Sequence, residues 1–568
     1  MTLEVDMKTS GTSTPAEMKV GRVDRRTMAG QLSGRIDRLT RLRDRLRDVE
    51  WRRYAYLLLA GKALGIAVLF GAMYLISSAL GHGAHADEAA APVLKGNDIV
   101  NPINTVWTLV AAFLVFGMQA GFTMLEAGFC RSRETVNVLM ECVVDTCLCG
   151  LLFYAWGFAF MFGAGTPWFG TQYFFLQDIP ATYGSSGVAF LAFFLFQYAF
   201  ADTCSTITSG AMIGRTGFVG DLIYSVGVSG FIYPIFGHWA WGPDGWLAVM
   251  GSEGNVFTSL GMSFHDFAGS TVVHSIGGFV ALAGAIVLGP RIGRRFKRDG
   301  GGPMLPHDLT VATVGGFILW FGWYGFNPGS TLSAMDFEGI GRIATNTTLA
   351  ACAAGLSAMF YAFPKTNTWD VSFTVNGFLA GLVAITCPCY WVSPTGAVLL
   401  GLIAGVIVVA AVDALEYLRI DDPIGAVPVH GICGIWGTLS LGLFACGQYG
   451  ASGPMGADNS APLTGLLYGG GFTVLAAQMI GSAAIVLATF GTSLAMFYVL
   501  NLFGVLRVSE AGELQGLDLH EHGVPAYPEY ALHGPASPRG TPEFTERAYG
   551  PLAAGIAMPV RSTTSAKA

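Results

Sequence analysis

Two histidines occupy the same short pattern in two separate apolar stretches of this chain. The pattern V-H-x-I-x-G places the first at His274 and the second at His430. An ionisable side chain at membrane depth is energetically costly and marks a functional site by default. Because burial favours the neutral imidazole, two such rings can offer a hydrogen-bond donor and an acceptor to a small base. The repeat therefore predicts an internal duplication around one site.

Asp266 lies eight residues before His274, at the start of the same apolar stretch. An aspartate there can cap a helix by accepting hydrogen bonds from free backbone amides, and its charge can also attract a cation. Asp422 occupies a similar position before His430. A metal site shared by Asp266 and His274 is disfavoured, since eight helical residues span about 12 Å. The cysteines show no metal-site or redox spacing, so we expect neither a metal nor a cofactor.

The composition is that of a protein embedded in lipid. Of the 568 residues, 52% are hydrophobic and 12% are charged, about half the charged share of a soluble domain. The mean hydropathy is +0.52. These values exclude a soluble enzyme with a single membrane anchor. We expect a lipid bilayer around the chain and no nucleic-acid partner.

Apolar runs follow one another from about residue 100, and each is long enough to span about 30 Å of hydrocarbon. We predict an all-α polytopic membrane protein with eleven transmembrane helices. The runs lie near residues 104–129, 138–163, 188–212, 217–241, 266–289, 308–328, 343–363, 371–391, 395–415, 425–446 and 471–503. Further acidic residues fall in or beside these runs, and we expect them to pair or to line helix contacts. They are Glu126, Glu141, Asp145, Asp202, Asp221 and Asp413.

The basic residues predict the orientation. If residue 87 lies outside, the outer loops hold only Lys95 and Arg342, and the other basic residues beyond it fall in inner loops and the tail. His274 then lies in a descending run and His430 in an ascending run. Two five-helix halves of opposite orientation form an inverted repeat, a common plan of transport proteins, with an eleventh helix added. The C-terminus is predicted to be cytoplasmic.

The two ends of the chain differ from its middle. Residues 1–53 are polar and Arg-rich, and residues 54–86 form a first apolar segment that ends in an A-x-A pattern. This segment is typical of a signal peptide or of an uncleaved signal anchor. Residues 87–503 form the transmembrane domain. Residues 504–568 are rich in Pro, Gly, Ser and charges and are predicted to be a cytoplasmic tail.

Several motifs, in order along the chain, resemble those of the ammonium transporter (Amt/Mep/Rh) family. They are D-F-A-G-S-T-V-V-H at 266–274, G-F-N-P-G-S at 325–330, D-D-P with V-H-G at 421–431, and G-L-D-L-H-E-H-G at 516–523. The match runs from about residue 100 to 530. The resemblance implies a homotrimer in the cell (plasma or inner) membrane. It also implies regulation through the tail and a PII-type protein as a candidate partner at the cytoplasmic face.

The resemblance also assigns roles to individual residues. Trp241, Phe200 and Ser330 match an outer site that recruits ammonium or its analogue methylammonium, and Asp266 holds the shape of that site. The motif match, rather than spacing, favours Trp241 over Trp239. Phe200 and Phe326 match a stacked gate that bars hydrated ions. His274 and His430 match the histidines that line a narrow hydrophobic pore.

The function that we predict is ammonium transport rather than enzymatic catalysis. The apolar runs contain no G-x-S-x-G, H-E-x-x-H or paired catalytic aspartates. An ammonium sensor that signals to a partner is the alternative. A sensor would carry a signalling domain, and a tail of about 65 residues is too short for a kinase.

Overall fold

The computed structural model describes residues 97–450 and 462–528. The chain divides into two compact units, residues 1–90 and 91–568, and the described residues belong to the second. The predictions for residues 1–53 and for the segment 54–86 therefore lie outside the described residues. The same holds for the tail beyond residue 528.

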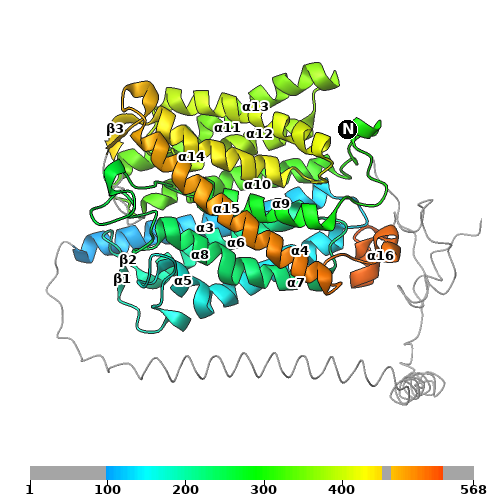
Figure 1. Ribbon diagram of the computed structural model, residues 1–568, viewed down its shortest axis with the longest axis horizontal. Coiled ribbons are helices and arrows are strands. Elements are labelled where there is room, and N and C mark those ends of the chain that lie inside the picture. The colour runs from blue at the N-terminus through cyan, green and yellow to red at the C-terminus, as the bar shows by residue number, and fades with distance from the viewer. Residues whose placement is uncertain (1–96, 451–461, 529–568) are drawn as a thin grey trace, which may run out of the picture. The chain divides into compact units, whose positions relative to one another are not determined.

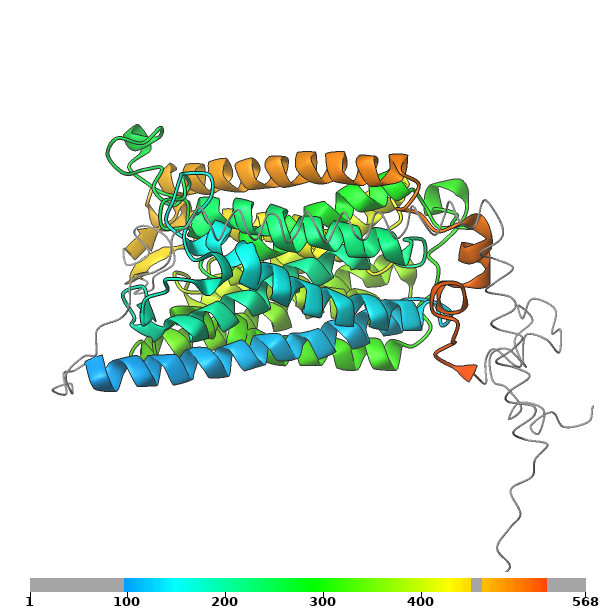
Figure 2. The same cartoon turned by 90° about the horizontal axis from the view of Figure 1, so that it is seen from below.

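The all-α polytopic prediction is confirmed. Within the described ranges, ten helices are long and apolar enough to cross a membrane, and α12 is apolar but shorter. Each lies at one of the eleven predicted runs, and Figures 1 and 2 show them side by side. In chain order they are α3 (Asn97–Phe129), α4–η1–α5 (Thr135–Phe162), α6 (Phe190–Gly210), α7–η3–α8 (Phe218–Trp241), η5–α9 (Ser270–Leu288), α10 (Leu309–Phe326) with η7 (Pro328–Thr331), α11 (Phe337–Thr366), α12 (Val371–Thr386), α13 (Pro394–Leu418), η8–α14 (Val427–Phe444) and α15 (Thr473–Leu502).

Smaller elements occupy the loops and the tail. Strand β1 (Thr182–Tyr183) pairs antiparallel with β2 (Val188–Ala189), and β3 (Cys446–Gly450) pairs antiparallel with β4 (Pro462–Thr464). The short loop helices are η2 (Phe174–Leu176), η4 (Thr258–Leu260), η6 (Lys297–Asp299) and η9 (Leu466–Tyr468). The described part of the tail forms α16 (Glu510–Gln515) and the π-helical turn η10 (Asp518–His522).

The two histidine-bearing helices are built alike. Each begins with a π-helical turn, η5 (Ser270–Ser275) or η8 (Val427–Ile432), and π-turns are frequent at functional sites. A glycine with positive φ precedes each turn, Gly269 at 113° and Gly425 at 84°. The two helices run in opposite directions and pack closely, since a Cβ atom on Gly278 would lie 2.2 Å from the Gly431 amide nitrogen. This is the arrangement that an inverted duplication predicts.

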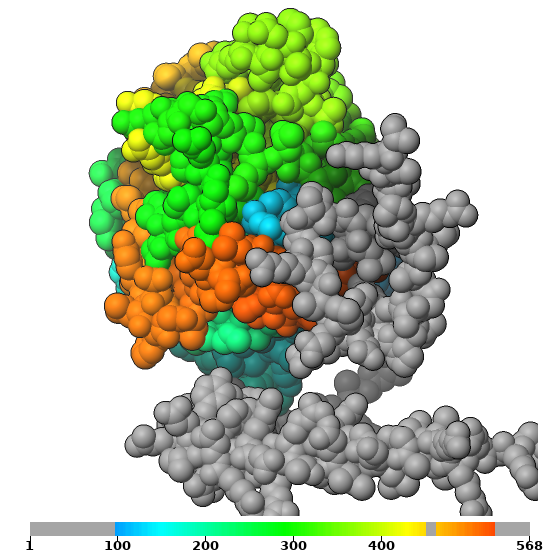
Figure 3. Space-filling view, turned by 90° about the vertical axis from the view of Figure 1, so that its right-hand side faces the viewer, coloured from blue at the N-terminus to red at the C-terminus, as the bar shows by residue number. Residues whose placement is uncertain are grey.

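Arginines and the tail mark one end of the bundle, which we call the basic end. The Arg215 guanidinium donates hydrogen bonds to the backbone carbonyls of Gly289 and Asp421. The Arg507 guanidinium donates to the carbonyl of Leu288 and to the Glu513 carboxylate. Figure 3 views this end, where the orange-red C-terminal segment packs beside the green loop that follows α9. We call the opposite end, where α8 finishes, the tryptophan end.

A buried ion pair joins two loops at the basic end. Two nitrogens of Arg291 donate to the Asp421 carboxylate at 2.8 and 2.9 Å, and both residues are at most 5% exposed. Burial alone would raise the pKa of Asp421, but the hydrogen bonds and charge of Arg291, with the charge of Arg215, hold that pKa well below its ordinary value. The pair therefore stabilises the folded state at every pH above the ordinary pKa of aspartate, and its contribution is lost only as the pH falls through the depressed value.

Replacing Arg291 with alanine is expected to lower the free energy of unfolding by about 3 kcal/mol, because the buried Asp421 carboxylate would lose both guanidinium hydrogen bonds and keep only the longer side-chain contact with Arg294 at 3.3 Å. Thermal unfolding of the detergent-purified protein measures the loss. The matched control is Lys365→Ala, which breaks the more exposed pair with Asp413 and is expected to change stability by about 1 kcal/mol or less. Equal effects of the two substitutions would contradict the prediction.

Candidate functional site

Five aromatic rings form a continuous buried stack between the tryptophan end and the middle of the bundle. We call it the ring column, and its members are Trp241, Phe200, Phe326, His274 and His430. The ring centroids of Trp241 and Phe200 lie 6.2 Å apart, and those of Phe200 and Phe326 lie 4.0 Å apart. The His274 ring follows at 5.4 Å from Phe326 and 5.3 Å from His430. Every member is at most 5% exposed.

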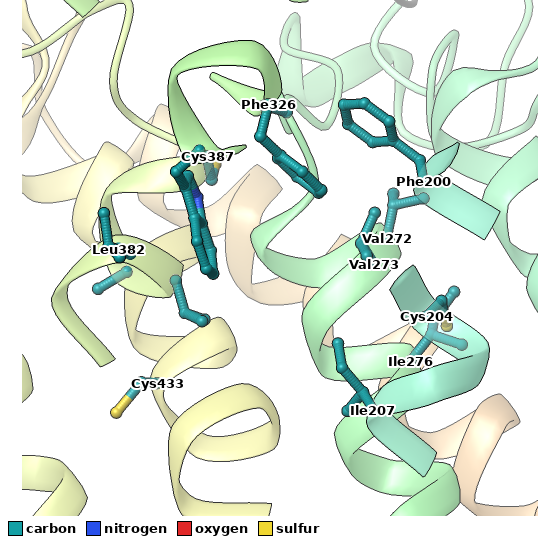
Figure 4. Packing of buried hydrophobic residues seen from close by; sticks show 14 of the residues in the cluster. Phe200, Cys204, Ile207, Val272, Val273, Ile276, Phe326, Leu382, Cys387 and Cys433 are labelled. Atoms are coloured by element: carbon teal, nitrogen blue, oxygen red, sulfur yellow. The ribbon is translucent and has the colours of Figure 1, made fainter. Parts of the chain in front are cut away.

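The two phenylalanines close the column from opposite sides. Phe200 comes from α6 and Phe326 from α10, and their planes meet at 24°. Figure 4 shows the two rings facing each other, above apolar side chains that include Val272 and Ile276. A stacked pair of this kind leaves no room for a hydrated ion unless the rings move, because their faces are already in contact.

The two histidines form a hydrogen-bonded pair below the phenylalanines. The Nδ1 atoms of His274 and His430 lie 3.2 Å apart. One Nδ1 must donate and the other accept, so the two neutral rings are in different tautomers. The Nε2 atom of His274 has no hydrogen-bond partner in the described part of the chain. The pair therefore places hydrogen-bonding groups among otherwise apolar side chains.

Two residues of this region escaped the sequence analysis. The Trp323 ring stacks on His274 at 5.2 Å, and the Phe122 ring lies 6.3 Å from His430. A signal for Trp323 exists, because it precedes Phe326 by three residues in α10 and therefore shares its helix face. Phe122 has no comparable signal, since α3 is apolar on most of its surface.

Asp266 takes the capping position that the sequence predicts. Its Oδ1 atom accepts hydrogen bonds from the amides of Gly269 and Ser270, each at 2.9 Å. Its Oδ2 atom accepts from the amides of Thr271 and Val272 at 2.8 and 2.9 Å. Burial raises the pKa of Asp266 to about 6, even though these amides favour the charged form. The carboxylate therefore fixes the first turn of the helix that carries His274.

Asp422 repeats this arrangement at the basic end. Its carboxylate accepts hydrogen bonds from the amides of Gly425, Ala426 and Val427 at 2.8–3.1 Å. His430 follows Asp422 by eight residues, the same interval that separates His274 from its capping aspartate. The repeat is therefore longer than V-H-x-I-x-G and includes D-x-x-G, a pattern that is present in the sequence but was not identified there.

The structure distinguishes the two neighbouring tryptophans. The Trp241 indole nitrogen donates a hydrogen bond of 2.7 Å to the Asp266 carbonyl, and its ring faces Phe200. Trp239 instead packs its ring against those of Trp168 and Trp246, away from the column. Ser330, which the resemblance places in the outer site with Trp241 and Phe200, lies buried one turn beyond Phe326. Its hydroxyl donates a hydrogen bond to the Phe326 carbonyl at 2.8 Å.

A cavity of about 170 Å³ opens at the basic end. Its lining includes Asp422 and Pro428, which flank the start of the helix that carries His430, and the arginines Arg291 and Arg294. Burial raises the pKa of Asp422, although its hydrogen bonds from backbone amides and the charge of Arg215 favour the charged form. The cavity brings solvent-accessible space to within two residues of His430 along the chain.

The acidic residues of the apolar helices behave in two ways. Asp413 pairs with Lys297 and Lys365 at 3.1 and 2.6 Å, as predicted. The others form no ion pair within the described residues and are buried at contacts between helices, which is the second of the two expected arrangements. They are Glu126, Glu141, Asp145, Asp202 and Asp221.

Comparison with known proteins gives consistent results. The family model described as Ammonium Transporter Family matches residues 106–527. Ammonium transporter Amt2 of Archaeoglobus fulgidus is 44% identical over 455 residues, covering 79% of this chain and 92% of the relative. Ammonium transporter 1 member 3 of Solanum lycopersicum is 38% identical, covering 76% and 94%.

Solved structures resemble the fold as well. One titled Sensor Amt Protein has a TM-score of 0.66 and 37% identity, and covers 75% of this chain and 99% of its own. Mep2 of Candida albicans has a TM-score of 0.65 and 28% identity, covering 79% and 94%.

Proposed function

The chain belongs to the ammonium transporter family of multi-pass membrane proteins, and on that premise we propose that it conducts ammonium through the ring column. The observation that carries this proposal is the hydrogen-bonded pair of His274 and His430, buried among apolar side chains at the inner end of the ring column. An ammonium ion at the centre of a bilayer carries the large penalty of an unpaired buried charge. Ammonia carries no charge, and the two imidazoles can donate to it and accept from it.

Recruitment takes place at the tryptophan end. The faces of Trp241 and Phe200 offer a cation–π surface to ammonium, and Ser330 retains free lone pairs on its hydroxyl oxygen for an N–H donor. Asp266 holds the Trp241 indole through its carbonyl and adds negative charge nearby. Phe200 and Phe326 then gate entry, so that the substrate must lose its water before it reaches the histidines.

Uptake of labelled methylammonium into a host that lacks its own ammonium transport tests the proposal. Expression of the intact chain is expected to restore uptake, and unlabelled ammonium is expected to compete with the label. Uptake no higher than in the empty host, with the protein present in the membrane, would overturn the proposal.

Replacing Trp241 with leucine is expected to raise the KM for methylammonium by about 2- to 30-fold, because a cation–π contact of about 0.5–2 kcal/mol is removed. Trp241→Phe keeps an aromatic ring, so its KM is expected to lie between those of the intact chain and of Trp241→Leu. Trp239→Leu is the matched control and is expected to leave KM within about twofold, since Trp239 packs away from the column. Concentration-dependent uptake measures all three.

A sensor remains the second candidate function, because a structural neighbour at 37% identity is titled Sensor Amt Protein. A sensor would bind ammonium at the same site and report it through the tail. Its signature would be a response in the host that persists in a His274→Ala variant that no longer takes up methylammonium. If the host response were lost together with methylammonium uptake in this variant, the sensor function would be excluded.

The membrane orientation, the oligomeric state and the protein partner are proposed on the same premise. We infer that the basic end faces the cytoplasm, and this is supported by the arginines and the tail that gather there. A homotrimer with one pore per subunit and a PII-type regulator at the cytoplasmic face complete the proposal. Protease access to the tail in oriented vesicles tests the orientation.

A further inference from the structure

The imidazole ring of His238 lies in the last turn of α8 and meets two backbone carbonyls. Its Nδ1 atom lies 2.9 Å from the Met161 oxygen, its Nε2 atom lies 2.8 Å from the Thr166 oxygen, and the residue is fully buried. A carbonyl oxygen can only accept a hydrogen bond, so each ring nitrogen must supply a hydrogen. Imidazolium has two N–H groups, whereas the neutral ring has one. The geometry therefore requires the charged form of His238.

A second histidine, at the basic end, shows the contrast. The Nδ1 atom of His307 lies 3.0 Å from the Cys130 carbonyl, but its Nε2 atom lies 3.0 Å from the Tyr527 hydroxyl. A hydroxyl can donate to an unprotonated nitrogen, so a neutral ring satisfies both contacts of His307. The two carbonyl partners of His238 leave no such alternative.

The backbone around His238 favours a positive charge. His238 is in the last turn of its helix, where the free carbonyls carry the negative end of the helix dipole. The Met161 carbonyl is in the last turn of α5, where backbone carbonyls have no helical donor. Figure 1 shows α5 and α8 as neighbours, so the ring of His238 joins the ends of two adjacent helices.

His238 also holds the loop that follows α5 against the end of α8. Each of the loop residues 165–168 forms a hydrogen bond to the end of α8 or to the segment behind it, and the partners in order are Asp244, His238, Trp246 and Trp239. The bonds to the two tryptophans are both 3.1 Å long. His238 is the member of this set whose bond to the loop depends on a proton that can be lost near neutral pH.

The same helical turn carries Trp241. The His238 carbonyl accepts a hydrogen bond of 2.8 Å from the amide of Gly242, the residue after Trp241. A Cβ atom on Gly242 would lie 2.1 Å from His238 Nδ1, so the imidazole packs directly against this backbone. The Trp241 ring in turn faces Phe200 and bonds to the Asp266 carbonyl. A shift of this turn would therefore move Trp241 relative to the other residues of the recruitment site.

The ionisable groups around His238 lie on α8, on the elements packed against it and in the adjoining loops. Helix α5 and the π-turn η3 carry none. Two carboxylates occupy the adjoining segments: Asp244 holds the Gly165 amide, and Asp266 caps η5. The remaining groups are Tyr198, Asp202 and Cys204 on α6, Tyr233 on α8, His274 on η5, Tyr498 on α15, and Tyr173, Asp178, Tyr183, Glu253 and His265 in the loops. Both nitrogens of His238 bond to carbonyls, so its proton is held by the backbone rather than by a carboxylate.

We propose that His238 is a positioning residue for ammonium recruitment, and that its imidazolium form holds the last turn of α8 so that Trp241 keeps its place in the site. The inference rests on the proposed function. As the external pH rises, one N–H bond of the ring breaks and the proton passes to water. The nitrogen that has lost it then directs its lone pair at a carbonyl oxygen, so repulsion replaces a hydrogen bond. The turn loosens, and ammonium binds more weakly at high pH than at low pH.

Uptake of labelled methylammonium at a series of external pH values from about 5.5 to about 8.5 tests the inference. Methylammonium, like the side chain of lysine, stays protonated over this range, so the supply of cation is constant. The KM of the intact chain is expected to rise at least about fivefold from the lowest pH to the highest, which corresponds to about 1 kcal/mol. Titration of Asp266 would act in the opposite direction, because its ionised carboxylate attracts the cation.

Two variants identify the titrating group. His238→Gln has no charged form, so its KM is expected to be raised at every pH and to lose its pH dependence. Asp244→Asn is the matched control, because it keeps an acceptor oxygen for the Gly165 amide but removes the titratable carboxylate. Asp244→Asn is expected to keep the pH profile of the intact chain.

The outcomes separate this inference from the transport function. Uptake by the intact chain with a KM that is flat or falls as the pH rises would overturn the role of His238 and leave transport in place. The same holds for an unchanged pH profile in His238→Gln, or for loss of the profile in Asp244→Asn. The profiles of the intact chain and of Asp244→Asn keep the test decisive even if His238→Gln does not fold. An intact chain that reaches the membrane and takes up no methylammonium at any pH would overturn both proposals.

Discussion

Replacing Asp266 with alanine is expected to abolish methylammonium uptake and to leave little folded protein. The substitution removes four hydrogen bonds to the amides of residues 269–272, all of which are buried. Each unpaired buried amide costs about 1–3 kcal/mol, so the sum is comparable to the whole stability of a typical domain. The yield of monodisperse protein in detergent, together with uptake, measures the effect.

Asparagine provides a graded comparison at both capping positions. Asp266→Asn retains one acceptor oxygen and loses the two bonds made to the other, whereas Asp422→Asn loses a single bond, to Val427. We therefore expect a larger fall in melting temperature for Asp266→Asn than for Asp422→Asn. Wild-type stability of Asp266→Ala would show that the carboxylate is not what holds the first turn of its helix.

Replacing His274 and His430 together with leucine is expected to reduce methylammonium uptake about 5- to 150-fold. The pair supplies hydrogen bonds at the driest part of the column, and their loss removes about 1–3 kcal/mol of stabilisation from the conducted base. The fold should persist, because leucine fills a similar volume and no ion pair is broken. Uptake of label and selectivity for ammonium over potassium are the quantities to measure.

His520→Gln is the matched control for this double substitution. His520 is exposed on the tail, so its replacement is expected to leave uptake unchanged. If the double leucine variant transported ammonium as fast and as selectively as the intact chain, the histidines would not be the conducting groups. The single variant His274→Leu adds a further check, because it leaves the Nδ1 atom of His430 without its partner.

Much of the fold and part of the site could be predicted from local features of the chain. Hydropathy and length located every span, because a helix in lipid must be apolar over its whole length. The repeated pattern around His274 and His430 identified the central pair, since an internal duplication keeps short-range spacing. The capping position of Asp266 was also predictable, because the bonds that define it reach only six residues along the chain.

Only the tertiary structure decided how side chains from distant helices meet. Trp323 and Phe122 join the histidines, and Arg291 meets Asp421 across 130 residues, without a signal of comparable strength in the sequence. In a membrane protein the faces toward lipid and toward the core are both apolar, so helical periodicity does not reveal which face is buried. The π-turn η3 further shifts the register between Ser225 and Tyr233. For this reason the chain alone determined the spans and the paired histidines, while packing decided the ring column.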